Sequence, residues 1–334
     1  MPSAVDVVAA PSAALEAAVA RLMPDAGPLR WSALTGGVSS DIWRIEGPTG
    51  VFCVKRALPR LKVADDWFAP VRRNREEVKW LRFAATVAPA QVPRVIAADA
   101  DAGIAILSWF DPGQWQNWKQ LMMANQVRPA LGADAGRLLA ALHRASYRRD
   151  DLAAAFDNLD LFEALRLAPY FGRAGERNPE VAVLLAQLCA GLATHRTALV
   201  HGDFSPKNML VHHAHPLVLL DAECACYSDP AFDVAFLMSH LLLKTMRLKS
   251  VRPWLYDTLR RFEAEYAAAA PEPVDARTRL LLPALLLARV DGSSPVEYLD
   301  YASTAYVRET ALQALENPKP TMAFVAAWAD ANPL

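Results

Sequence analysis

The chain has 334 residues, a length that fits two domains or one large two-lobed unit with a substantial core. Its formal net charge is −1, so no basic field argues for a nucleic-acid partner. The four cysteines fit no disulfide framework and are typical of a reducing compartment. The N-terminus has no secretory pattern, and the most apolar run, residues 280–290, is too short to cross a bilayer. These features predict a cytoplasmic protein with no membrane partner.

The first third of the chain reads as a β-rich region. An Ala-rich amphipathic pattern predicts a helix over residues 12–23. Five β-like runs follow at residues 29–34, 41–46, 51–57, 95–98 and 104–110, with a helical pattern at 71–86 after the third run. Asp111-Pro112-Gly113 then breaks the pattern. The sequence therefore predicts an N-terminal lobe over residues 1–110, built from an antiparallel sheet and a helix.

Two features of this region are typical of a phosphate site. Residues 35–40, TGGVSS, form a Gly-rich turn between strands, which can bring backbone N–H groups close to phosphate oxygens. Lys55 is a lone charge on an apolar strand, so it requires a partner or a ligand. The following helix offers Glu76 and Glu77. We favour Glu77, because Leu81 and Ala84 follow it at helical spacing and place it on the inward face; Glu76 is the alternative.

Residues 111–334 read as mainly helical and predict the larger C-terminal lobe. Helical patterns cover residues 115–127, 131–145, 159–168, 179–195, 230–248, 252–269, 274–290, 302–315 and 320–331. Residues 172–180 are predicted to be a polar loop. The fold class predicted for the whole chain is α+β.

The stretch TALVHGDFSPKNMLVHHAHPLVLLDAE, residues 197–223, interrupts these helices with three short strands. Strands are predicted at residues 198–200, 209–211 and 217–220, and the segments between them carry Asp203, Asn208, Asp221 and Glu223. Carboxylate and amide oxygens at strand ends suit Mg²⁺, which takes its remaining ligands from phosphates and water. A phosphoryl-transfer site needs one more carboxylate, to orient an acceptor hydroxyl and take its proton.

His201-Gly202-Asp203, with Asn208 five residues later, resembles the catalytic loop of the protein-kinase-like fold in its aminoglycoside phosphotransferase and choline kinase branch. The resemblance implies a two-lobed fold in which Asp203 is the catalytic base and Asn208, Asp221 and Glu223 hold Mg²⁺. It gives structural roles to His201 and to Asp233, whose carboxylate would accept hydrogen bonds from the loop backbone.

The same resemblance implies an ATP site in the N-terminal lobe. Lys55 would bind the α- and β-phosphates and pair with Glu77. The Gly-rich turn would cover the phosphates, and the backbone around Leu107 to Trp109 would accept the adenine. The nucleotide-site residues are Gly36, Gly37, Ser39, Ser40, Lys55, Leu107 and Trp109.

Within this branch the motifs look most like 5-methylthioribose kinase. The resemblance is carried by residues 55–63, Asp66-Trp67, the D-x-E form of Asp221 and Glu223, and Phe232-Asp233. It implies a sugar hydroxyl as acceptor, with Trp67 and Arg289 as candidate substrate contacts. Asn208 departs from that family, which usually has a serine there, and only Arg289 represents its paired arginines.

The sequence therefore predicts a kinase that transfers the γ-phosphate of ATP to a hydroxyl of a small metabolite, a methylthioribose-like pentose being the first candidate. The alternatives are an aminoglycoside or amino-alcohol acceptor of the choline and ethanolamine type, and an inactive nucleotide-binding protein. The alternative of an inactive protein predicts a missing lysine, base or metal acid, and all three are in the sequence. Assembly as a homodimer is left open.

Overall fold

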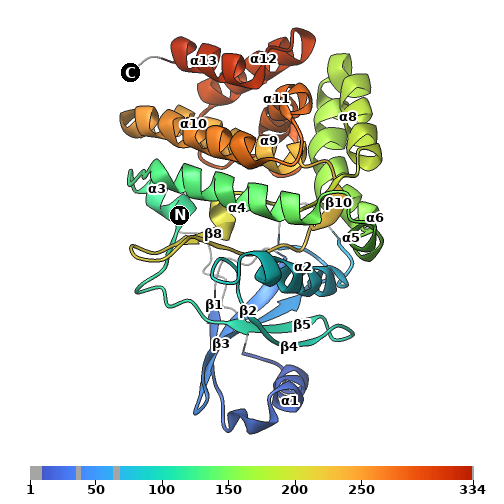
Figure 1. Ribbon diagram of the computed structural model, residues 1–334, viewed down its shortest axis with the longest axis vertical. Coiled ribbons are helices and arrows are strands. Elements are labelled where there is room, and N and C mark those ends of the chain that lie inside the picture. The colour runs from blue at the N-terminus through green and yellow to red at the C-terminus, as the bar shows by residue number, and fades with distance from the viewer. Residues whose placement is uncertain (1–9, 35–38, 63–67, 333–334) are drawn as a thin grey trace. The chain divides into compact units, whose positions relative to one another are not determined.

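The computed structural model describes residues 10–34, 39–62 and 68–332. The chain divides into two compact units, Met1–Gln114 and Trp115–Leu334, called unit 1 and unit 2 below. The sequence predicts the boundary a little earlier, before Asp111. Unit 1 carries the sheet and unit 2 most of the helices, so the chain has the α+β architecture expected from the sequence (Figure 1).

Unit 1 contains one antiparallel sheet of five strands in the order β1-β2-β3-β5-β4. The strands lie close to the predicted runs, except that the last ends at Ser108 rather than at residue 110. The pairing of β3 with β5 sets Lys55 opposite Ala105 and Val54 opposite Ile106. The bounds are β1 Arg30–Leu34, β2 Ser40–Gly47, β3 Gly50–Ala57, β4 Val95–Asp99 and β5 Ile104–Ser108.

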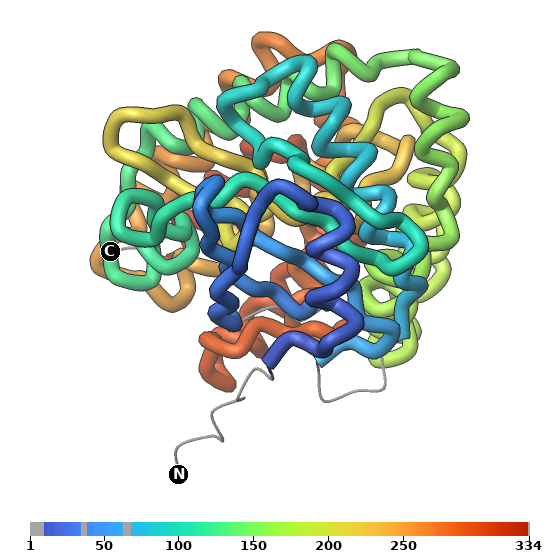
Figure 2. Tube along the Cα trace, turned by 90° about the horizontal axis from the view of Figure 1, so that it is seen from below, coloured from blue at the N-terminus to red at the C-terminus, as the bar shows by residue number. Residues whose placement is uncertain are grey.

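Two helices pack on opposite faces of this sheet. The part of the chain that forms the sheet runs from blue to teal in Figure 2. Helix α1 (Ala13–Leu22) begins at Ser12, whose hydroxyl accepts a hydrogen bond from the Leu15 N–H, and packs its apolar side chains into a cluster with Val54. Successive strand residues point to opposite faces, so Lys55 lies on the other face, where α2 (Arg73–Val87) packs. The sheet therefore separates an apolar layer from the layer that holds Lys55.

Unit 2 is built from helices around two small β-structures. Strands β10 and β7 form one antiparallel pair, and β6, β8 and β9 form a three-stranded sheet. The strand bounds are β6 Gln116–Asn117, β7 Ala198–Val200, β8 Met209–Val211, β9 Val218–Leu219 and β10 Cys226–Ser228. The longer helices are α4 Ala130–Ser146, α8 Ala182–Thr194, α9 Ala231–Arg247, α10 Arg252–Ala269, α11 Asp275–Asp291, α12 Tyr301–Glu316 and α13 Thr321–Ala331.

Three predictions for unit 2 need correction. The helix expected over residues 115–127 is only α3 (Trp118–Met123), because residues 116–117 pair with β8 as a strand. The helix expected to end at residue 168 continues from α6 (Leu159–Phe162) into a π-helix, Glu163–Gly172. The predicted polar loop at 172–180 contains helix α7 (Arg173–Arg177), and helix α5 (Asp150–Ala155) was not predicted.

The pair α4 and α10 shows how closely these helices pack. A Cβ atom on Gly132 of α4 would lie 2.0 Å from the backbone oxygen of Thr258 on α10. Such a distance is impossible for real atoms, so glycine is required for this approach of the two backbones. Helix α9 is buried along nearly its whole length and packs against both α10 and α11. Among the described residues, no helix combines the length and the apolar character that crossing a membrane requires.

Candidate active site

The centre of unit 2 is the loop between β7 and β8, and its backbone is held by one buried carboxylate. Asp233, near the start of α9, accepts a hydrogen bond from the His201 N–H on Oδ2 (2.6 Å) and one from the Gly202 N–H on Oδ1 (2.9 Å). Nε2 of His143 lies 3.3 Å from Asp233 Oδ2, and its Nδ1 lies 2.9 Å from the hydroxyl of Tyr266. Asp233 is fully buried, so these contacts fix its orientation and, through it, the loop.

Gly202 brings the loop into contact with the segment that follows β9. Its φ of +73° lies in the left-handed region. A Cβ atom at this position would stand 2.6 Å from the backbone oxygen of Cys224. Both the conformation and the lack of space therefore require glycine between His201 and Asp203.

His201 takes part in the same arrangement as a neutral imidazole. Its Nε2–H donates to the Leu220 carbonyl (3.0 Å), and its Nδ1 accepts from the Asp203 N–H (3.2 Å). Burial lowers the pKa of His201, which agrees with a ring that donates through one nitrogen and accepts through the other. The imidazole thus connects the loop to the end of β9.

Asp203 is a buried carboxylate with two cationic partners. Its Oδ2 lies 2.9 Å from Nη2 of Arg166 and 2.9 Å from Nζ of Lys207. Burial favours the neutral acid, but the positive charges of Lys207 and Arg166 outweigh it and hold the pKa of Asp203 below its ordinary value. The carboxylate is therefore ionised at neutral pH, as a proton acceptor must be.

Arg166 reaches Asp203 from the π-helix, a contact that the sequence did not predict. Its Nε–H donates to the Gly202 carbonyl (2.6 Å), and its guanidinium lies over the rings of Tyr170 and Phe236. A single arginine in an amphipathic helical pattern carries no signal of such a role. Lys207 is also a residue that sequence reasoning passed over, although it stands four residues after Asp203 in the same loop.

The candidate metal ligands follow in the same segment. The side chain of Asn208 donates from Nδ2 to the backbone carbonyl of Asp203 (2.9 Å). The backbone carbonyl of Asn208 accepts a hydrogen bond from the Leu220 N–H (2.8 Å). This link joins Asn208 to the residue before Asp221. Asp221 has a φ of +66°, a costly conformation for a residue with a side chain, and Glu223 is buried. Hard oxygen donors at a strained, fixed position fit Mg²⁺.

In unit 1, Lys55 and Glu77 form a buried ion pair. Nζ of Lys55 lies 2.9 Å from Oε1 and 2.8 Å from Oε2 of Glu77, so both carboxylate oxygens face one ammonium group. Glu76, the alternative partner, pairs instead with Lys79 (2.5 Å) and with Arg75 (3.1 Å). The geometry thus favours the inward face chosen from the sequence.

The other predicted nucleotide-site residues lie around this sheet. Ser40 begins β2, and the Ser39 carbonyl accepts hydrogen bonds from the Leu58 N–H and the Arg73 guanidinium. Leu107 is buried in β5, and Arg44 lies over the ring of Trp109. Gly36, Gly37 and Trp67 lie outside the described residues.

The comparison with family models decides the family. The model described as "Phosphotransferase enzyme family" (APH) matches residues 30–271, which is most of the chain. The chain belongs to this family. Among curated proteins, none matches the sequence significantly.

Solved structures agree with the phosphotransferase assignment at the level of the fold. The amicoumacin kinase hAmiN has a TM-score of 0.55 at 16% identity, covering 94% of this chain and 96% of its own. A choline/ethanolamine kinase family protein from Mesorhizobium loti has a TM-score of 0.50 at 18% identity, covering 94% of this chain and 98% of its own. The streptomycin–ATP complex of APH(2″)-IIa has a TM-score of 0.51 at 17% identity, covering 91% of this chain and 97% of its own. The phosphotransferase therefore has the two-lobed kinase-like fold, with an antiparallel sheet in one lobe and helices in the other.

Arg289, the predicted substrate contact, lies in the last turn of α11 in this phosphotransferase. Its Nη1 donates to the Ser294 hydroxyl (3.0 Å) and lies 3.4 Å from the Tyr170 hydroxyl. Its guanidinium carbon lies 5.8 Å from the centre of the Tyr170 ring. These contacts are compatible with a substrate-contact turn and equally with an ordinary end of helix α11.

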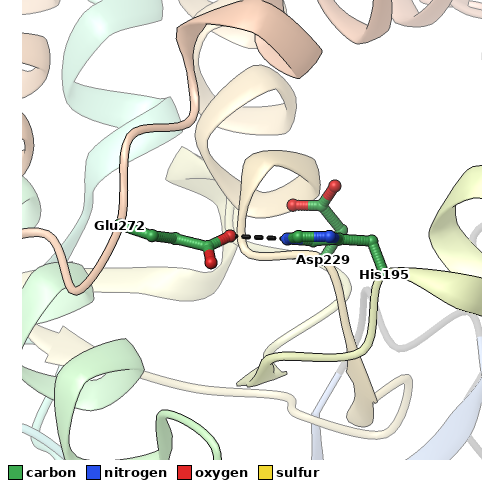
Figure 3. A group of neighbouring side chains, drawn as sticks. All are labelled: His195, Asp229 and Glu272. Atoms are coloured by element: carbon green, nitrogen blue, oxygen red, sulfur yellow. Dashed lines mark hydrogen bonds and ion pairs between the residues drawn. The ribbon is translucent and has the colours of Figure 1, made fainter.

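A group of potential metal ligands also lies elsewhere in unit 2 of the phosphotransferase. His195, Asp229 and Glu272 offer ligand atoms that all lie within 4.8 Å of one another, and Figure 3 shows Nε2 of His195 pointing to the carboxylate of Glu272. Arg277 supplies the positive charge here, through ion pairs to Asp229 (2.6 Å) and Glu272. Tyr147 adds a hydrogen bond to Glu272. With a guanidinium already among the carboxylates, we interpret this group as a structural ion-pair network.

Proposed function

We propose that the protein is a kinase that transfers the γ-phosphate of ATP, with Mg²⁺, to a hydroxyl of a small metabolite. The observation that carries this proposal is Asp203, a buried carboxylate kept ionised by Arg166 and Lys207 on a loop fixed by Asp233. Membership of the phosphotransferase family supports the reaction class. Unit 1 would bind the nucleotide, and unit 2 would supply the base and the metal ligands.

In this reaction the residues of the chain act mainly by position and charge. Mg²⁺ bound by Asn208, Asp221 and Glu223 would neutralise charge on the transferring phosphate. Lys55, oriented by Glu77, would bind the α- and β-phosphates as a point charge. Asp203 would accept the hydrogen bond of the acceptor hydroxyl and take its proton as the hydroxyl oxygen bonds to the γ-phosphorus and the bond from that phosphorus to ADP breaks.

The chemical class of the hydroxyl acceptor can be narrowed by the family resemblance and by the charges around Asp203. The motifs like those of 5-methylthioribose kinase favour a sugar hydroxyl, with Arg289 among its contacts. The neighbouring structures include enzymes named for aminoglycosides and for choline or ethanolamine, which keeps a cationic acceptor as the alternative. The carboxylate of Asp203 is itself paired with two cations, which does not favour a cationic group beside it. A role as an inactive nucleotide-binding protein is opposed by the presence of Lys55, Asp203 and Asp221.

The test of this function is a screen for ATP-dependent phosphorylation of hydroxyl compounds, with mass spectrometry of each product. Wild type should yield a product heavier by one phosphate, and Asp203→Asn should not. Asp330→Asn, which makes the same change at an exposed position of α13, is the matched control and should behave as wild type. Product formation by Asp203→Asn at the wild-type rate would contradict the assigned role of the base.

A further inference from the structure

Helix α9 buries a lysine, Lys244, away from carboxylates of the described residues. Lys244 is 1% exposed, and its ammonium donates to the His240 carbonyl at 3.2 Å. In the described part of the chain, no acidic side chain lies within ion-pair distance of it. A buried ammonium without a carboxylate partner is costly, so such a group is rarely kept without a use.

The surroundings of Lys244 are positively charged as well. Lys119 from α3 and Arg289 from α11 both act on it electrostatically, and Glu297 is the only acid found to act on it among the described residues. Glu297 is itself paired with Lys119 (2.7 Å) on the exposed side. We call Lys119, His240, Lys244 and Arg289 the cationic cluster. Three of its members are cations, and Glu297 is the one carboxylate found to act on Lys244 among the described residues.

Two further polar atoms beside the cationic cluster have no hydrogen-bond partner among the described residues. They are the buried Nε of Arg289 and the buried hydroxyl of Tyr298. The ammonium of Lys244 lies 5.8 Å from the centre of the Tyr298 ring. Buried donors of this kind are normally satisfied, and an anion would satisfy a donor and a charge together.

Titration of the lysine agrees with this geometry. Burial, followed by the charges of Lys119 and Arg289, lowers the pKa of Lys244 to about 7, against a smaller opposing effect of Glu297. Burial also keeps the pKa of His240 well below its ordinary value, with Lys244, Arg289, Lys207 and Lys119 acting in the same direction. A bound anion would favour the charged form of the lysine and raise its pKa.

The cationic cluster is connected to Asp203 by aromatic side chains. The guanidinium carbons of Arg166 and Arg289 lie 5.6 Å and 5.8 Å from the centre of the same Tyr170 ring. Phe236 lies under Arg166, and its ring centre is 5.0 Å from that of His240. His240 follows Asp233 by seven positions in α9, which is about 10 Å along the helix axis. A small molecule with its hydroxyl at Asp203 can therefore place another group at the cationic cluster.

Resting on the function proposed above, we propose that the acceptor carries an anionic group, a carboxylate or a phosphate, which binds at Lys244 and Arg289 while its hydroxyl lies at Asp203. The cationic cluster would repel the ammonium groups of an aminoglycoside or an amino alcohol. A neutral sugar would leave the unpaired donors unsatisfied. The acceptor class is therefore a hydroxylated acid or a sugar phosphate.

The first test measures binding without turnover. D-gluconate, glucose 6-phosphate, glucose and glucosamine share one carbon skeleton and differ in charge, and inorganic phosphate is a fifth probe. By calorimetry, the anions should bind wild type at least tenfold more tightly than glucose or glucosamine. Lys244→Met, which preserves shape and removes the charge, should lose this difference, whereas Lys249→Met at an exposed position should keep it. Equal binding of anions to wild type and Lys244→Met would overturn the proposal.

The pH dependence gives a second readout that a merely structural lysine would not show. D-gluconate keeps its charge throughout the range, so its affinity for wild type should fall by up to about tenfold per pH unit above the pKa of Lys244, about 7. Lys244→Met should give a flat profile and a higher melting temperature, because a buried charge has been removed. An unchanged profile in Lys244→Met would contradict the role of this lysine.

Mg–ATP binding separates this proposal from the proposed function. If Mg–ATP binds and glucosamine or glucose is phosphorylated in preference to the anions, the kinase function stands and the anionic acceptor is wrong. If Mg–ATP does not bind, the proposed function fails, and anion binding at Lys244 is judged by calorimetry alone. Preference for gluconate over glucose 6-phosphate, or the reverse, distinguishes a carboxylate from a phosphate.

Discussion

Arg166 and Asp203 form a buried ion pair, with Nη2 and Oδ2 2.9 Å apart, although they come from a π-helix and a loop far apart in the sequence. Asp203 has a lowered pKa, so its contribution to stability is present above the ordinary pKa of an aspartate, about 3.9, and is lost as pH falls through the lower folded value. The same shift should keep the base active at mildly acidic pH.

Removing the Arg166 charge should therefore move the acidic limb of the pH–rate profile upward. Arg166→Met should raise the pKa of Asp203, since one of its two cationic partners is lost. The measurement is kcat between pH 4 and 7 with an identified acceptor. Arg173→Met, an exposed change in the next helix, is the control. An unshifted acidic limb in Arg166→Met would show that another group sets it.

The Lys55–Glu77 pair predicts a nucleotide defect. Lys55→Ala should raise the KM for ATP and lower turnover, because a point charge at the phosphates is removed. Glu77→Ala should have a similar but smaller effect, since the lysine remains without its orienting partner. Both variants are compared with Glu76→Ala by ATP kinetics and by melting temperature, because both glutamates are buried. A larger KM effect in Glu76→Ala than in Glu77→Ala would contradict the pairing as the functional one.

Substitutions of Asp203 and of Asn208 should impair turnover in different ways. Asp203→Asn preserves shape and should retain ATP binding, but lose about a hundredfold to ten-thousandfold in turnover, the usual size of a general-base contribution. Asn208→Ala should lose activity that raised Mg²⁺ partly restores, because it weakens metal coordination and leaves the base in place. Steady-state kinetics over a Mg²⁺ series compares the two. Near-normal kcat in Asp203→Asn would mean that positioning, rather than proton transfer, dominates.

The left-handed backbone of Asp221 predicts that two substitutions at this position differ in stability. Asp221→Gly relieves the conformational cost, whereas Asp221→Ala keeps a side chain at a φ of +66°. Asp221→Ala should therefore be less stable to urea than Asp221→Gly by about 1 kcal/mol. Calorimetry should show weakened Mg–ATP binding in both variants, since each lacks the carboxylate. Equal stability of the two would show that the backbone relaxes at this position.

The network of His195, Asp229, Glu272 and Arg277 should depend on the arginine and not on a metal. A chelator should leave the melting temperature of the nucleotide-free protein unchanged. Arg277→Met should destabilise it by about 1–3 kcal/mol, because two buried or half-buried carboxylates lose their shared cation. A rise in melting temperature on adding Zn²⁺, absent in His195→Ala, would instead identify a metal site.

The sequence predicted the parts of the site that depend on local pattern. Short apolar strands separated by polar loops located Asp203 and Asp221, and a single charge in an apolar strand located Lys55. The ion pair with Glu77 followed from helical spacing, and the structure contains it. The five-stranded sheet followed in the same way from alternating runs bounded by turns.

What the sequence did not predict depends on contacts between distant segments. The π-helical winding that carries Arg166 cannot be distinguished from an α-helical pattern by periodicity over so few residues. Lys244 is different, because a signal was present: it directly follows three leucines, a pattern like the apolar neighbours that identified Lys55. Its environment was missed because the cationic cluster comes from three helices that only the fold brings together.

The π-helix at Glu163–Gly172 has a consequence for how this protein can change over evolution. Removing one residue from such a segment would return it toward ordinary α-helical winding and rotate Arg166 by about 100°. The surrounding helices could remain in place while Asp203 lost one of its two cations. A single-codon deletion here is therefore a short genetic route to a folded relative whose base titrates at a higher pH, and an insertion is the route back.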